Sequence, residues 1–200
     1  MTSGAVFAQH NRDDLHHALR AATRGIHDRL HCHAGFAAIQ DGTIGLTAYQ
    51  SLLARLYGFH YAFEQAAHIG TDRSKWLHDD LKVLGAAGER IATLPRCAAF
   101  SPIKTSSERL GALYVIEGST LGGLALCRGL NHLFGAGSVE GRRFFAGRGR
   151  GTAPAWSAFL ANLKKADDGP AARAEIVGAA VHIFSVFEIW LAAWEDTSLG

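Results

Sequence analysis

The sequence predicts an all-α protein with a single domain, and three observations support this prediction. Apolar residues recur at three- and four-residue spacing in six segments, which is the spacing of one face of an α-helix. The alternating apolar and polar pattern of a strand is absent apart from residues 142–145, a stretch too short to count. The chain has 200 residues, of which 48% are hydrophobic, and this is enough for one domain with a sizeable core.

The first three helices are expected over residues 13–33, from residue 47, and over residues 73–91. The apolar stripes that indicate them are Leu15, Leu19, Ala22, Ile26 and Leu30 in the first, Tyr49, Leu53, Leu56, His60 and Phe63 in the second, and Trp76, Leu77, Leu81 and Leu84 in the third. Glycine and other breakers place the connections at residues 35–45 and 68–72.

The last three helices are expected from about residue 106, from Pro154 and from Pro170. The two prolines indicate helix starts because proline is favoured in the first turn of a helix. Their stripes are Leu110, Leu113, Tyr114, Glu117, Leu121 and Leu124, then Trp156, Phe159, Leu160 and Leu163, and finally Ile176, Ala180, Phe184, Phe187, Leu191 and Trp194. No linker divides the chain. Residues 1–12 are expected to be a flexible N-terminus, and residues 13–195 the domain.

Composition argues against several classes of function. Twenty Lys and Arg against 18 Asp and Glu give a net charge of +2, so there is no electrostatic case for nucleic acid or an anionic membrane. No uncharged apolar run approaches the ~18 residues of a membrane span. Cys32, Cys97 and Cys127 form no CxxC pair, and no secretory leader is recognisable, so we expect a cytoplasmic protein.

The helix expected after residue 106 is unusually rich in glycine. Gly118 and Gly122 are four residues apart, so both lie on one helix face, and Gly123 widens the bare strip. Each glycine inside a helix costs ~1 kcal/mol relative to alanine, so something should approach the backbone here. Spacing alone leaves two interpretations open, which are a second helix packed closely and a flat ligand.

The first helix carries the histidine with the most informative surroundings. His27 has Ile26 and Leu30 on its apolar side, while Arg20 and Arg24 lie on the same helix, about two turns and one turn earlier. An imidazole beside an apolar slot with basic residues at its rim suits haem, with iron on the nitrogen and propionates on the cations.

The other histidines carry less weight. His27 and His31 are four apart and could together hold a metal on a helix face, but no HExxH or CxxCH motif occurs. His60 and His182 lie within apolar stripes, so we expect them to be buried and hydrogen-bonded. The glycine- and arginine-rich residues 147–151 follow no strand and are expected to be a flexible basic connector, not a nucleotide-binding loop.

Four stretches of the chain carry a family resemblance: LRAATRGIH at residues 19–27, LGALYVIEGSTLGG at 110–123, FFAG at 144–147 followed by Trp156 and Phe159, and the final Phe184, Phe187, Glu188 and Trp190. With these motifs the chain resembles the haem oxygenases, especially the bacterial biliverdin-producing branch associated with bacteriophytochromes. The resemblance spans residues 14–194. It implies a helical bundle with haem sandwiched between the first helix and a glycine-kinked distal helix.

The resemblance also assigns roles to residues. The proximal iron ligand falls on His27, the basic positions near the haem propionates on Arg20 and Arg24, and a propionate-approaching tyrosine on Tyr114. The distal helix of the resembled family falls on Gly118 through Gly123, with Gly118, Ser119 and Gly122 at the reacting face. There Ser119 stands where other relatives carry aspartate, so protons are expected to come through ordered water. A second departure is His31, because many relatives have glutamate at that position to orient the ligand imidazole.

The activity implied is oxidative cleavage of haem to biliverdin, CO and ferrous iron. Haem is then both substrate and cofactor, and electrons come from an external ferredoxin or other reductase, with a bilin-accepting phytochrome as a further partner. Two alternatives stay open from the sequence. One is a non-catalytic haem-binding or haem-transfer protein with the same fold. The other is a related all-α fold for a small organic substrate such as a thiamin precursor, which needs a cysteine or carboxylate cluster that we do not find.

Overall fold

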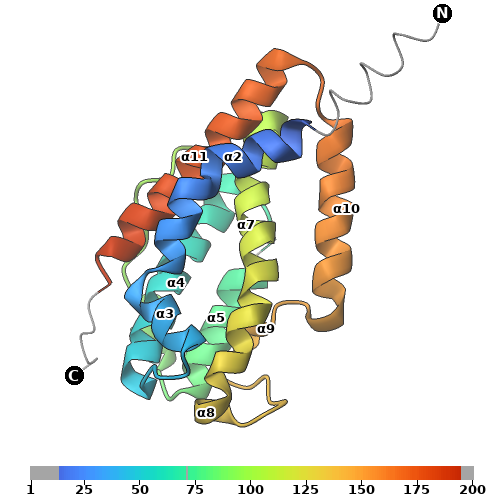
Figure 1. Ribbon diagram of the computed structural model, residues 1–200. Helices are drawn as coiled ribbons and strands as arrows, with labels where there is room; N and C mark the ends of the chain where they lie inside the picture. Colours follow the sequence, from blue (N-terminus) through green and yellow to red (C-terminus); the bar gives the residue numbers. More distant parts are fainter. Residues whose placement is uncertain (1–13, 71, 195–200) are drawn as a thin grey trace, which may run out of the picture.

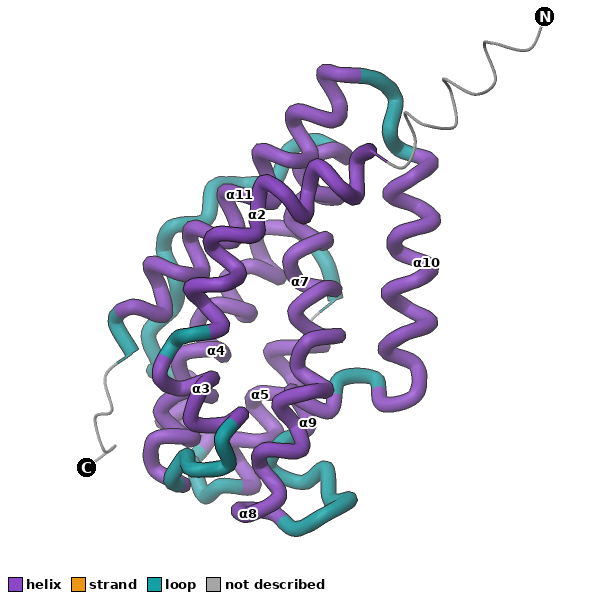
Figure 2. The backbone as a smooth tube through the Cα atoms, viewed as in Figure 1, coloured by secondary structure: helices purple, strands orange, loops and turns teal. Residues whose placement is uncertain are grey.

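The computed structural model describes residues 14–70 and 72–194 (Figures 1 and 2). Within these residues the chain forms helices and loops without a strand, so the all-α prediction is confirmed. The expectation of a flexible segment at residues 1–12 lies outside the described residues. Residues 142–145 include a short helical turn in place of extended chain.

The described helices agree with the predicted stripes, with two differences. Their bounds are α2 Asp14–His31, α3 Ala34–Gln40, α4 Leu46–Ala67, α5 Asp72–Val83, α6 Gly88–Ala92, α7 Ser106–Cys127, α8 Asn131–Phe134, α9 Arg143–Ala146, α10 Thr152–Lys165 and α11 Pro170–Ala192, with 3₁₀ turns at Arg128–Leu130 and Gly149–Gly151. The expected break at 35–45 contains α3, because the His33 ring accepts a hydrogen bond from the Gly35 amide and caps a new helix. The expected helix 73–91 is interrupted at Gly85, whose φ of +88° ends a right-handed helix.

Local chemistry explains where the two longest apolar helices begin. Thr105 caps α7 in a capping box, in which its hydroxyl accepts from the Glu108 amide and the Glu108 carboxylate accepts from the Thr105 amide. Pro170 is the first residue of α11, as predicted. Pro154 is instead the third residue of α10, because that helix already begins at Thr152.

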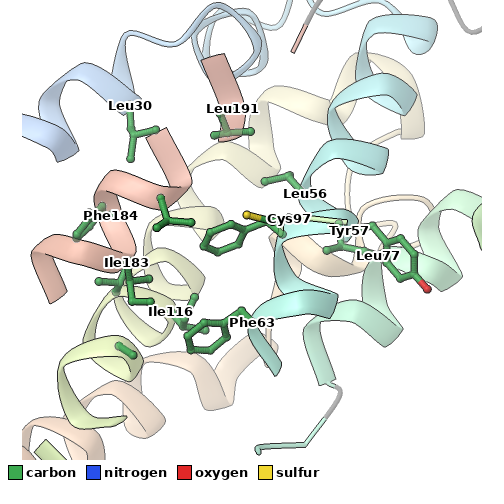
Figure 3. Packing of buried hydrophobic residues seen from close by; sticks show 14 of the residues in the cluster. Leu30, Leu56, Tyr57, Phe63, Leu77, Cys97, Ile116, Ile183, Phe184 and Leu191 are labelled. Carbon is green, nitrogen blue, oxygen red and sulfur yellow. The ribbon is translucent and has the colours of Figure 1, made fainter. Parts of the chain in front are cut away.

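The core is built from one face of each long helix. Figure 3 shows side chains from α2, α4, α7 and α11 converging in it, among them Leu30, Leu56, Phe63, Ile116, Ile183 and Leu191. Phe59 and Phe63 of α4 are fully buried and stack in parallel with 6.4 Å between ring centroids. Burial of apolar side chains, these aromatic ones included, is the main favourable contribution to folding.

α7 and α11 form the most extensive helix pair in the described part of the chain. A side chain at Gly111 would overlap the carbonyl oxygen of Ile176, so this glycine is what allows the two backbones to approach. By length and composition alone, the segment Ser106–Phe134 and α11 could each cross a membrane, but core helices of soluble proteins pass the same test. Here the two helices pack against each other in the bundle.

Two histidines differ from expectation. His60 is buried as predicted, yet its Nδ1 atom makes no hydrogen bond with the described residues. His182 is exposed, contrary to the prediction of burial. Apolar neighbours in the sequence indicate the helix correctly, but they do not fix the direction of a side chain at the edge of the stripe.

Candidate functional site

The candidate site lies where α2 approaches α7. His16, Thr23 and His27 are spaced by seven and four residues, so they share one flank of α2. The His16 ring lies edge-on to the Tyr114 ring of α7, with 6.0 Å between centroids. In Figures 1 and 2 the two helices meet near their N-terminal halves and separate toward their C-terminal ends. His27 lies one turn beyond Thr23 on this flank of α2, and its own ring contact outside α2 is with Phe184 of α11.

His27 is accessible, and its ring has three neighbours. Its side chain is 59% exposed, and its ring lies edge-on to His31 and to Phe184 of α11, with centroid distances of 5.5 and 6.4 Å. The Nδ1 atom lies 3.6 Å from a carboxylate oxygen of Asp28. No described residue hydrogen-bonds to the Nε2 atom. A free imidazole nitrogen of this kind is a suitable ligand for iron.

Tyr114 and Arg20 form the polar part of the site. Tyr114 is buried, and burial raises the pKa of its phenol, while the positive charge of Arg20 and a hydrogen bond with Thr23 act against that rise. The structure therefore brings Arg20 and Tyr114 together. The Arg24 side chain is exposed, and its Nε atom lies 3.7 Å from the carboxylate of Asp28, which also approaches the His27 ring.

The three predicted glycines have three different surroundings. A Cβ atom at Gly122 would meet nothing within 4 Å, and Gly122 is exposed. A Cβ at Gly118 would lie 3.6 Å from the ring of Trp156 in α10, so this glycine is covered by an aromatic side chain. At Gly123 it would lie 3.4 Å from the carbonyl oxygen of Phe145, on another side of the helix. The predicted bare strip is thus open at Gly122 and bounded by Trp156.

Ser119 lies beside the open glycine. It is three residues before Gly122, so both fall on neighbouring parts of the same face, and both are exposed. The Ser119 hydroxyl donates a hydrogen bond of 2.9 Å to the Ile116 carbonyl oxygen. Because its donor is engaged within the helix, Ser119 presents its oxygen lone pairs as an acceptor to whatever approaches this face.

These residues fit a haem group. The site combines an imidazole with a free nitrogen, an α-helix whose backbone is open at Gly122, and a cationic and phenolic corner at Arg20 and Tyr114. An open backbone accommodates a flat ligand, and the corner matches carboxylate groups. No group of three or more His, Cys, Asp or Glu that could hold a bare metal ion occurs among the described residues.

Sequence reasoning missed two contributors to this region. Glu117 directly precedes the glycine segment and accepts hydrogen bonds from Arg73 and Arg148, which come from distant parts of the chain. Its signal in the sequence is a carboxylate in an otherwise apolar stripe. Arg148 belongs to residues 147–151, which the sequence predicts to be a flexible connector; its guanidinium is instead bound to α7.

Comparisons with known proteins match most of the chain. The model of the family described as Heme oxygenase matches residues 13–193. A Heme oxygenase of Xanthomonas campestris pv. campestris (strain 8004) is 30% identical over 167 residues, which cover 78% of this chain and 96% of that relative. The family match includes both helices that form the candidate site.

Proposed function

The chain belongs to the haem oxygenase family, and on that premise we propose that it cleaves haem to biliverdin, CO and ferrous iron, using O₂ and electrons from an external donor. The observation that carries the proposal is the exposed imidazole of His27, on the flank of α2 that contacts the glycine helix. Bound haem would supply both the iron that binds O₂ and the porphyrin carbon that is oxidised.

The protein's own residues would bind and orient that group. His27 would hold the iron through Nε2, and Asp28 near Nδ1 favours the tautomer that leaves Nε2 free. Arg20 and Tyr114 would bind a propionate, and Arg24 would supply a second positive charge on the same helix. Gly122 would let the porphyrin edge approach the backbone of α7.

Proton supply at the distal face follows from the residues present there. Ser119 offers a hydroxyl oxygen and Gly122 an open main chain, while Gly118 is covered by Trp156, and none of the three brings a carboxylate or an imidazole. We therefore propose that ordered water, which donates a hydrogen bond to the Ser119 oxygen, carries protons at this face.

Partners and location are part of the proposal. The motifs at residues 19–27 and 110–123 support the bacterial biliverdin-producing branch, with a ferredoxin or other reductase as donor and a bilin-accepting phytochrome as recipient. The cysteines Cys32, Cys97 and Cys127 are free thiols, which supports a cytoplasmic protein. The net charge of +2 supports one that acts apart from nucleic acid and anionic membranes.

A second candidate is a haem-binding or haem-transfer protein that does not oxidise its ligand. It is favoured by one observation, which is that His31 replaces the carboxylate expected one turn after His27. A histidine there brings no fixed negative charge to the ligand imidazole, so the reduction potential of the iron would be higher than with glutamate.

One experiment separates the two. The chain is reconstituted with hemin and then given ascorbate, or ferredoxin with its reductase, in the presence of O₂. We expect loss of the Soret band, appearance of biliverdin absorption and release of CO. A Soret band that persists without biliverdin or CO would favour the transfer protein, and absence of any Soret band would reject both.

A further inference from the structure

We propose that Glu117, held between Arg73 and Arg148, positions the open glycine segment of α7 and fixes the spacing between α7 and α10. The inference deepens the proposed function, on which it rests, because that segment is the face assigned to haem. It concerns positioning residues, since none of the three side chains lies on the face that carries Gly122.

The three side chains form a compact ionic cluster. One carboxylate oxygen of Glu117 accepts from Arg73 Nη2 at 2.6 Å, and the other accepts from Arg148 Nη1 at 2.8 Å. The Arg73 side chain is 4% exposed and that of Glu117 is 14% exposed. Although burial alone raises the pKa of Glu117, the bonds from Arg148 and Arg73 hold it below its usual value, so the carboxylate is charged.

The cluster ties α7 to two other helices of the bundle. Arg73 belongs to α5, and its Nε atom donates to the Thr120 hydroxyl of α7 at 3.2 Å. Its backbone amide donates to Glu64 of α4 at 2.9 Å, and Glu64 also accepts from Ser74. Glu117 and Thr120 therefore anchor the buried side of α7 to α5, and hydrogen bonds to Glu64 connect α5 to α4.

The same cluster ties α7 to α10. Gly147 has a φ of +54°, and a Cβ there would lie 3.0 Å from Thr120 and 3.1 Å from the Thr152 hydroxyl. This close fit brings the following residue, Arg148, onto Glu117, while its amide donates to Thr152 at 2.9 Å. α10 begins at Thr152, and its Trp156 covers Gly118. Arg148 thus links the start of α10 to the glycine segment.

A glycine helix needs such an anchor for a physical reason. Gly118 and Gly122 contribute no side chains to packing, and glycine leaves the backbone freer to bend. The face that receives a ligand cannot also hold the helix in place. Contacts on the opposite face must do so, and charged hydrogen bonds supply both strength and direction.

The test compares two arginines in one loop. Arg148→Gln removes the ion pair with Glu117, while Arg150→Gln changes an exposed arginine two residues later that bonds to no described residue. In the haem-free protein, we expect Arg148→Gln to accelerate amide hydrogen exchange across residues 118–126. After reconstitution, the Kd for hemin should rise about tenfold, because the binding face of α7 is less well positioned. The C–O stretch of the ferrous CO complex should also shift.

Arg148→Lys keeps the charge and should restore part of the hemin affinity, which guards against misfolding of the Gln variant. Arg150→Gln should match the wild-type chain throughout. The proposal is overturned if Arg148→Gln leaves exchange at 118–126 unchanged, or if Arg150→Gln produces the same effects. If the wild-type chain binds no hemin, the proposed function fails, and hydrogen exchange alone still decides the positioning role.

Discussion

At the scale of single residues, His27 and His78 have similar local sequences but different surroundings. Each is followed by an aspartate near its Nδ1 atom, at 3.6 Å for Asp28 and 3.4 Å for Asp79. A basic residue precedes each aspartate by four positions and lies within ion-pair distance of it. His27 lies on the flank of α2 on which His16 contacts Tyr114 of α7, whereas His78 lies on α5 beside Tyr57 of α4. The tertiary position, not the local motif, distinguishes them.

This pair gives a prediction for the iron ligand. His27→Ala should abolish the imidazole-ligated haem spectrum and weaken hemin binding at least about tenfold, since the ligand itself is lost. Added imidazole should restore the spectrum by filling the space left. Absorption and electron paramagnetic resonance of the reconstituted protein measure both. His78→Ala is the matched control and should bind hemin normally; unchanged ligation in His27→Ala would mean that another residue holds the iron.

At the scale of elements, the glycines of α7 serve two purposes. Gly111 allows the α11 backbone to approach, whereas Gly122 leaves an open face. A glycine kept inside a helix without any neighbour costs stability that alanine or leucine would recover. At Gly122 the helix therefore loses stability and keeps an accessible backbone, whereas at Gly111 the missing side chain is required for packing against α11.

Gly122→Leu should separate stability from binding. The exposed position accepts a side chain, so the free energy of unfolding should rise by roughly 0.5–1 kcal/mol from helix propensity. Hemin binding should weaken about tenfold or more, because the leucine occupies the face assigned to the porphyrin. Urea denaturation and hemin titration measure the two effects.

Gly178 provides the control, because it is another helical glycine at which an added Cβ atom would meet nothing within 4 Å. Gly178→Leu should gain stability without losing hemin affinity. By contrast, Gly111→Ala should destabilise the fold, because its methyl group meets the Ile176 carbonyl oxygen. Normal hemin affinity in Gly122→Leu would show that haem does not use this face.

At the scale of the whole molecule, two buried groups give stability opposite dependences on pH. Burial raises the pKa of Asp80 to about 7, although the Phe144 and Arg143 amides that it caps favour its charged form. As the pH falls from 7 toward 4, folded Asp80 takes up a proton before the unfolded chain does, so stability is gained. Burial, with Arg73 nearby, lowers the pKa of His60 to about 3. As the pH falls from 6.5 toward 3, the unfolded chain takes up that proton first, so stability is lost.

Single substitutions should reveal each contribution. In Asp80→Asn, the free energy of unfolding should fall as the pH is lowered from 6.5 to 4.5, because the contribution of His60 is no longer offset. In His60→Leu, it should rise over the same range. The readout is the slope in urea denaturation at several pH values, not the absolute stability, which either substitution also changes. Two variants that keep the wild-type slope would contradict this account.

The positions of the long helices and the identity of the candidate residues follow from the amino-acid sequence alone. Stripes such as Leu15, Leu19 and Leu30 depend on spacing within one helix, and helix periodicity is a local property. The motif residues His27 and Gly122 can likewise be named as candidates from the sequence, but the surroundings that set them apart come from the fold.

Which of those residues are exposed, and which contacts they make, depends on how the helices pack in three dimensions. Trp156 covers Gly118 from a different helix, and Arg148 binds Glu117 across 31 positions. His60 is buried without a partner for Nδ1, and His182 is exposed, although both occupy apolar stripes. Such contacts join elements that are distant in the chain, so they are set by the close packing of side chains between helices and not by helix periodicity.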